Sequence, residues 1–223
     1  MGLNQQGVAD KELDFFVQMQ TKKSLELTHK YHLEETKHVS QLLNKQSNKI
    51  NNAIVVGCGN LRYRDLAIEN SILYIGIDLY LKNQLTVDRS DYDLVLLNKC
   101  FSEVASEDLT TGPSAWIFPF NVYPYLPKAR STILRLTSPS DVLMFSTWNV
   151  ANPEATKVRD NYYSTLPDAI NSQLYGEASQ GLFAELQETL LTDSHYCIRK
   201  EQEFITTYTF RPGLEEFDAL PFT

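Results

Sequence analysis

The segment NNAIVVGCGNLRYRDLA, residues 51–67, decides the fold expected of this 223-residue chain. A short apolar run ends in Gly-Cys-Gly and a mixed polar and apolar segment follows at once, which predicts a strand, a glycine turn and a helix. Gly57 and Gly59 allow the backbone to turn tightly and to approach a ligand without an intervening Cβ. Such a turn is typical of a site for an anionic or nucleotide-like ligand.

Beyond this turn, strand-like and helix-like segments alternate. The apolar runs that we expect to form strands are residues 72–80, 92–101, 114–123 and 141–149. Residues 127–138 form the clearest helical pattern between them, and further helices are expected over 154–166 and 181–191. A closing pair of strands is expected within 195–210, where the side chains alternate. Alternating strands and helices predict parallel βαβ units.

Residues 10–46 contain neither Gly nor Pro and predict one or two helices ahead of the first strand. We therefore divide the chain into an N-terminal helical extension or lid (1–49), a cofactor-binding and catalytic domain (50–211) and a C-terminal tail (212–223). A lid would close over the ligands. The alternative is that the N-terminal helices pack on the far side of the sheet or form a dimer contact.

Composition narrows the classes of function. The net charge of −8 and the lack of a basic cluster disfavour a nucleic-acid partner. Three widely spaced cysteines match neither a disulfide framework nor zinc ligands, and no apolar run reaches the roughly 18 residues of a membrane helix. The first residues do not resemble a secretory signal. We expect a cytoplasmic protein that does not bind membranes, and a homodimer stays open.

His29 and His32 share one face of the expected N-terminal helix, but they lack an i,i+4 pairing or a cysteine partner. We therefore predict no metal site. Cys58 is predicted to be a packing residue, because no histidine is near it in sequence to remove its proton.

The glycine turn differs from the common phosphate-binding loops. No Gly-Lys-Ser/Thr follows it, and Arg62 stands where a dinucleotide fingerprint has its third glycine. Asp78 comes 21 residues after Gly57 and ends the second expected strand. A carboxylate at that strand tip can accept hydrogen bonds from both hydroxyls of a ribose.

This ordered set, over about residues 50–210, resembles the class I S-adenosylmethionine-dependent methyltransferases. The resemblance implies a Rossmann-like α/β fold with a mostly parallel sheet, an antiparallel C-terminal strand and helices on both faces. It implies S-adenosylmethionine as cofactor and S-adenosylhomocysteine as product. The cofactor-binding residues that it implies are Gly57, Cys58, Gly59, Asp78, Leu79, Cys100, Phe101 and Pro119.

In this family the end of the fourth strand faces the donor methyl group, which places Asn121 and Tyr123 as candidate catalytic residues. A base is needed only if the acceptor is a hydroxyl or a protonated amine, and a histidine of the N-terminal helices could also serve. Aromatic residues expected to line the substrate cavity are Tyr123, Tyr125, Trp148, Tyr162 and Tyr163, although core packing explains some of them equally well. They favour a small, aromatic or partly apolar metabolite as substrate.

Two alternatives stay open. The first is a Rossmann-type reductase that uses NAD(P), whose ribose Asp78 would bind equally well. The second is a catalytically degenerate methyltransferase fold that acts as a binding subunit, because Val55 and Leu61 stand where the family often has an acidic residue and a third glycine.

Overall fold

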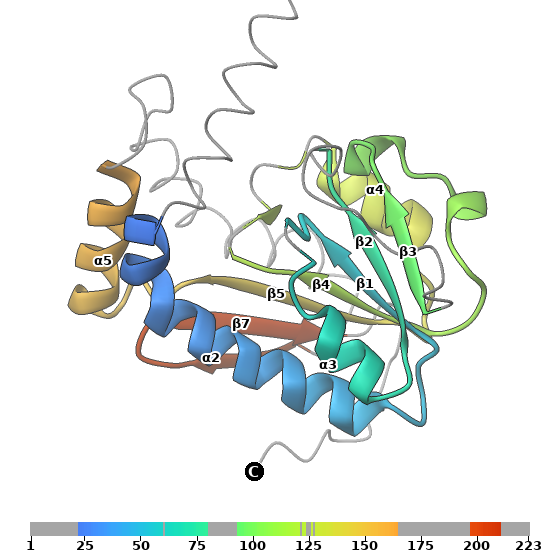
Figure 1. Ribbon diagram of the computed structural model, residues 1–223, viewed down its shortest axis with the longest axis horizontal. Coiled ribbons are helices and arrows are strands. Elements are labelled where there is room, and N and C mark those ends of the chain that lie inside the picture. The colour runs from blue at the N-terminus through green and yellow to red at the C-terminus, as the bar shows by residue number, and fades with distance from the viewer. Residues whose placement is uncertain are drawn as a thin grey trace, which may run out of the picture.

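A seven-stranded sheet with the order β3-β2-β1-β4-β5-β7-β6 forms the centre of the computed structural model (Figure 1). The structure describes residues 22–59, 61–79, 93–120, 122, 123, 126, 128–164 and 197–210. The strands are β1 (Asn52–Val56), β2 (Leu73–Ile77), β3 (Leu94–Leu97), β4 (Ser114–Phe118), β5 (Val142–Trp148), β6 (Cys197–Glu201) and β7 (Ile205–Phe210). Neighbours among β1 to β5 pair in parallel, whereas β7 pairs antiparallel with β5 and β6. The predicted fold class is confirmed.

Helices cover both faces of the sheet, as predicted. They are α2 (Lys22–Gln46), α3 (Arg64–Glu69), α4 (Ala129–Leu136) and α5 (Pro153–Ser164), with 3-10 turns η2 (Phe101–Glu103) and η3 (Ser106–Asp108). Figure 1 shows α2 and α3 in front of the sheet and α4 behind it. The expected helix over 181–191 and the tail 212–223 lie outside the described residues.

The central strands are buried on both faces, which explains their continuous apolar sequences. All five residues of β1 and of β4 are buried. Ile54 and Val56 pack on the face covered by α4, while Ala53 and Val55 pack on the face covered by α2 and α3. This alternation follows from the two-residue period of a strand.

The described part of the N-terminal segment is a layer of this core. Val39, Leu42 and Leu43 of α2 are buried against the sheet, in the same cluster as Ala67 of α3. α2 therefore packs on one face of the sheet. The division into an N-terminal extension or lid, a catalytic domain and a tail stays a prediction. None of the described helices is both long and apolar enough to span a membrane.

The connections fix where a ligand can bind. The chain runs outward from β1 to β2 and β3, then returns to the other side of β1 to form β4 and β5. The order of strands therefore reverses between β1 and β4. In open parallel sheets, ligands bind beyond the carboxyl ends of the strands at such a point.

Candidate functional site

The glycine turn, residues 57–59, lies at the carboxyl end of β1 and contacts the tip of β2. The N–H of Gly59 donates to Oδ2 of Asp78 over 2.9 Å, and the N–H of Gly57 donates to the carbonyl of Ile77 over 2.7 Å. Both glycines have positive φ, 73° at Gly57 and 51° at Gly59, which a side chain would disfavour. Two predicted cofactor-binding residues far apart in sequence, Gly59 and Asp78, are thus held together.

Gly57 also leaves room for the chain that follows β4. A Cβ on Gly57 would lie 2.6 Å from Cγ2 of Val122. The turn after β1 and the segment after β4 therefore pack directly on each other at the switch point. A glycine is needed here for close packing of the protein on itself as well as for backbone conformation.

The other predicted cofactor-binding residues differ in exposure. Leu79 is 48% exposed beside Asp78, and Cys100 is half-buried after β3. Cys58, Phe101 and Pro119 are buried. Burial raises the pKa of the Cys58 thiol to about 12, with a further contribution from the Asp78 carboxylate, so Cys58 is a protonated packing residue.

The structure describes one of the two predicted catalytic residues. The Tyr123 ring is only 3% exposed and packs edge-on against Phe118 and Phe145, at centroid distances of 6.2 and 5.2 Å. This position makes Tyr123 a core residue, and its catalytic role stays a prediction. Asn121 lies outside the described residues.

The aromatic residues expected around the substrate are largely packing residues where they are described. Trp148 and Tyr162 are each 1% exposed and support Phe120, which lies 6.0 Å from Trp148 and 5.5 Å from Tyr162 between ring centroids. Tyr125 and the side chain of Tyr163 lie outside the described residues. Phe120, which directly follows β4 and Pro119, remains partly exposed.

A second set of contacts at this edge centres on Glu35 of α2, whose side chain is fully buried. The Glu35 cluster comprises Glu35, His32, Arg62, Tyr63, Phe120 and Ser146. The carboxylate accepts hydrogen bonds from the backbone N–H of Phe120 at 2.6 Å and from the hydroxyls of Tyr63 and Ser146. Arg62 Nη1 lies 3.4 Å from Glu35 Oε2. One side chain thus joins α2 to the carboxyl ends of β1, β4 and β5.

These contacts determine the charge of Glu35. Burial alone would raise the pKa of Glu35, but His32, Arg62 and the donating hydroxyl of Ser146 together lower it to about 2. Burial lowers the pKa of His32 and outweighs the opposite effect of Glu35. At neutral pH the cluster therefore combines a carboxylate with a neutral imidazole.

Glu35 is not among the site residues predicted from the sequence, because a glutamate on a helix with many charged residues is usually exposed to solvent. A signal was nevertheless present: Glu35 stands four residues after Tyr31 and four before Val39, on the apolar stripe of the helix. Tyr31 and Val39 are both fully buried. A carboxylate on such a stripe must have partners.

The backbone around the cluster is strained. Leu61, Tyr63 and Phe120 have φ of 61°, 68° and 49°, a backbone conformation that residues other than glycine rarely adopt. All three follow the carboxyl ends of β1 or β4. Residues in such conformations persist where surrounding contacts fix them, and they concentrate at functional sites.

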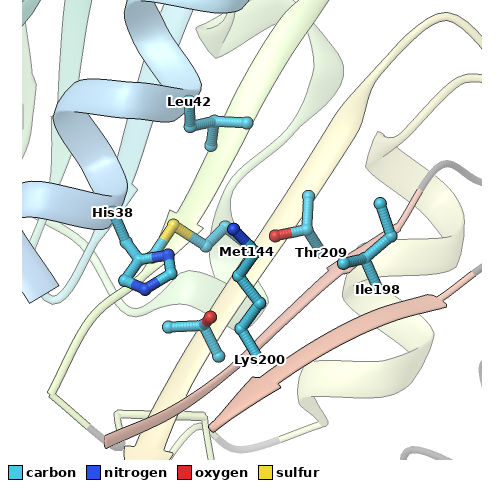
Figure 2. Close-up of a pocket in the computed structure, with 7 residues that line it drawn as sticks. His38, Leu42, Met144, Ile198, Lys200 and Thr209 are labelled. Carbon is cyan, nitrogen blue, oxygen red and sulfur yellow. The ribbon is translucent and has the colours of Figure 1, made fainter. Parts of the chain in front are cut away.

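A separate hollow lies on the face of the sheet that α2 covers, towards β7 and β6 (Figure 2). It is lined by His38, Leu42, Met144, Ile198, Lys200, Thr207 and Thr209. None of the predicted site residues lines it. Burial and the nearby Lys200 and Lys37 lower the pKa of His38 to about 4, so His38 is neutral at physiological pH. Among the described residues, no group of three or more metal-ligating side chains is found.

No protein-family model and no curated protein sequence matches the chain. Solved structures do match. The 1,6-didemethyltoxoflavin-N1-methyltransferase of Burkholderia thailandensis, with 1,6-didemethyltoxoflavin and S-adenosylhomocysteine bound, is 12% identical, covers 96% of this chain and 92% of its own, and has a TM-score of 0.55. The S-adenosylhomocysteine-bound methyltransferase PaMTH1 of Podospora anserina is 11% identical, covers 95% and 98%, and has a TM-score of 0.50.

The plantazolicin methyltransferase BpumL, in complex with a monoazolic analogue and S-adenosylhomocysteine, is 9% identical. The match covers 94% of this chain and 99% of that one, with a TM-score of 0.50. Similarity over nearly the whole length of each protein shows that this chain has the Rossmann-like fold of the class I methyltransferases, as the resemblance implied.

Proposed function

We propose that the protein is an S-adenosylmethionine-dependent methyltransferase. The observation that carries this proposal is the Asp78 carboxylate at the tip of β2, joined to the glycine turn of β1 at 2.9 Å. This pair lies beside the point where the strand order reverses, in a fold that the solved methyltransferases share. Fold alone would not define an activity.

The residues present fit the cofactor. The carboxylate of Asp78 suits the two ribose hydroxyls, and the exposed Leu79 and the half-buried Cys100 offer apolar surface for the adenine. The backbone of residues 57–59 would approach the methionine part, and Pro119 would lie towards the donor group. Once bound, the cofactor supplies an activated methyl group, so the protein needs mainly to bind, orient and exclude water.

We further propose that the acceptor is a small, aromatic or partly apolar metabolite. Phe120, at the carboxyl end of β4, is a partly exposed residue whose ring contacts the buried side chains of Trp148 and Tyr162. A planar acceptor could stack on such a ring. The similar enzyme from Burkholderia thailandensis binds 1,6-didemethyltoxoflavin, which supports a small-molecule acceptor here.

Calorimetric titration with S-adenosylhomocysteine tests the proposal, with NADH and NADPH as competing ligands. Binding of S-adenosylhomocysteine alone, with a rise in melting temperature, is the expected result, because a ligand that binds only the native state stabilises it. Binding of a nicotinamide cofactor instead would identify a reductase. Binding of none of them, with a partner protein retained on purification, would favour a degenerate binding subunit.

A further inference from the structure

The Glu35 cluster contains one side chain that its structural role does not explain. His32 lies one helical turn before Glu35 on α2, and its ring packs against Phe120 with centroids 4.7 Å apart and an angle of 38°. Phe120 directly follows Pro119, at the carboxyl end of β4. His32 thus lies at the strand end where the proposed function expects the acceptor and the methyl donor to meet, although it belongs to a helix that precedes the whole sheet.

The two ring nitrogens of His32 face different surroundings. Nδ1 is shielded from solvent and lies 3.9 Å from Oε2 of Glu35, a distance of ion-pair contact and too long for a hydrogen bond. The side chain is 21% exposed, so the exposed side of the ring carries Nε2. Within the described residues no hydrogen bond to Nε2 is found. The Glu35 carboxylate therefore lies near Nδ1 of the ring, while Nε2 is on the exposed side and has no hydrogen bond from the described residues.

Glu35 itself is engaged and cannot take a proton readily. It accepts hydrogen bonds from Tyr63, Ser146 and the backbone of Phe120. Against the effect of burial, His32, Arg62 and the Ser146 hydroxyl lower its pKa to about 2. The charged or titratable groups that act on the His32 ring are Glu35, Arg62 and His29. The combined effect of these groups and of burial lowers the pKa of His32, so the imidazole is neutral at pH 7. The neutral imidazole is the form that can accept a proton.

Other bases at this edge are less suitable. Burial and the Glu35 carboxylate raise the pKa of Tyr63 well above its usual value, so Tyr63 stays protonated. Tyr123 is enclosed in the core. Among the described residues of the Glu35 cluster, His32 alone combines a neutral basic nitrogen with exposure.

We propose that His32 is a catalytic base, which takes the proton of an O–H or N–H group on an acceptor stacked against Phe120 while Glu35 stabilises the imidazolium. This inference rests on the proposed methyltransferase function and narrows its substrate class to acceptors that must lose a proton. The proton of the X–H group passes to Nε2, and the electron pair left on X forms the bond to the methyl carbon. The pair of the carbon–sulfur bond stays on sulfur, and the imidazolium releases its proton to water.

The test is an NMR titration of the histidine ring signals with two ligands that differ by one methyl group and one positive charge. S-adenosylmethionine carries a sulfonium and S-adenosylhomocysteine does not. If His32 faces the methyl site, its pKa should be lower in the S-adenosylmethionine complex by roughly 0.4 unit, the effect of a unit charge about 7–8 Å away in water-like surroundings. The variant His32→Gln assigns the signal, and His29 and His38 serve as internal controls.

Equal His32 pKa values in the two complexes would overturn the inference while leaving the proposed function intact. Failure of both ligands to bind would overturn the proposed function, and the inference with it. His32→Gln should bind S-adenosylhomocysteine within about twofold of the wild type. With hydroxyaromatic and N–H heteroaromatic compounds as acceptors, His32→Gln should lose roughly 10²–10⁴-fold in kcat, whereas His29→Gln should keep its activity. Equal turnover by His32→Gln would also contradict the role.

Discussion

The two sides of the candidate ligand-binding edge are built differently. On the side of β1 and β2, the glycine turn and Asp78 lie 19 residues apart in the hydrogen-bonded pair and belong to consecutive strands. On the side of β4 and β5, Glu35 contacts Phe120 and Ser146 across 85 and 111 residues. The first side is a local motif that sequence patterns can indicate. The second side exists because an N-terminal helix packs onto a sheet that the chain forms later.

The two sides therefore hold their functional groups in place in different ways. The β1–β2 side uses backbone N–H groups and one carboxylate, which neighbouring strands hold in place. The β4–β5 side uses a buried carboxylate that accepts several hydrogen bonds. These hydrogen bonds offset the free-energy cost of burying its charge. We expect substitutions on the first side to change ligand affinity and substitutions on the second to change stability as well.

The largest expected effect is that of Glu35→Ala. This change leaves the Tyr63 and Ser146 hydroxyls and the Phe120 N–H without their buried acceptor, so the free energy of unfolding should fall by about 3–5 kcal/mol. Urea unfolding followed by circular dichroism measures it. The control is Glu154→Ala, which removes a 59%-exposed partner of Lys30 and should cost less than about 1 kcal/mol. Similar losses in both variants would show that Glu35 is not an anchor.

Gly57→Val should abolish detectable binding of S-adenosylhomocysteine, a loss of more than about 100-fold. Its side chain would meet Val122 at 2.6 Å and would strain a φ of 73°, which displaces the turn from the ligand. The matched control is Gly112→Val, because Gly112 also has a positive φ of 108° and a crowded Cβ position, 2.9 Å from Asn51. It lies just before β4, at the opposite edge of the sheet, and should leave the affinity of the folded protein unchanged. Calorimetric titration of both proteins compares them.

Asp78→Ala should weaken S-adenosylhomocysteine binding at least tenfold without a comparable loss of stability. A hydrogen bond to a charged group contributes about 1.5–3 kcal/mol, and 1.4 kcal/mol corresponds to a factor of ten. Asp93→Ala is the control, because Asp93 is an exposed residue at the start of β3. Equal affinities of wild type and Asp78→Ala would remove Asp78 from the ligand site and weaken the distinction between the two sides.

The most gradual expected effect is on the pH dependence of stability, and it comes from α2. The folded-state pKa of His38 is about 4 against 6.5, and that of Glu35 about 2 against 4.5. Both pKa values are lowered by folding, so the unfolded chain takes up protons first and stability falls as pH decreases. His38 should contribute a slope of up to about 1.4 kcal/mol per pH unit between pH 6.5 and 4, and Glu35 a further decrease below 4.5.

Urea unfolding at several pH values tests this prediction. His38→Gln should reduce the slope between pH 6.5 and 4, to which His32 also contributes through its lowered pKa, and leave the decrease below pH 4.5 in place. An unchanged slope in this variant would mean that His38 is not buried as a neutral ring.

Much of the fold could be predicted because its signals are local. Continuous apolar runs gave the five parallel strands, since strands buried on both faces need apolar residues at every position. The predicted helix over 127–138 corresponds to α4 at Ala129–Leu136, and the closing strand pair to β6 and β7. Boundaries were too wide, most clearly at 92–101, where the strand covers Leu94–Leu97. Here the strand ends at Leu97, which pairs with Ile77, the last residue of β2, and the 3-10 turn η2 begins at Phe101.

The candidate site likewise has a part that the sequence predicts and a part that it does not. The pairing of Gly59 with Asp78 is implied by the order of strands, because parallel strands bring their carboxyl ends to one edge. Tyr123 shows the limit, since a tyrosine after a strand can point into a cavity or into the core with the same sequence pattern. Only the packing of Phe118 and Phe145 around it decides the matter.

The sequence by itself determined the alternating architecture, the glycine turn and the acidic tip of the second strand, because each depends on residues close together along the chain. The tertiary structure alone decided that α2 is a layer of the core, that Glu35 has Tyr63, Ser146 and Phe120 as partners, and that His32 lies against the end of β4. The physical reason is that a buried carboxylate is stable only where donors converge on it. Those donors come from segments that are far apart along the chain, and no local sequence pattern indicates that these segments contact each other.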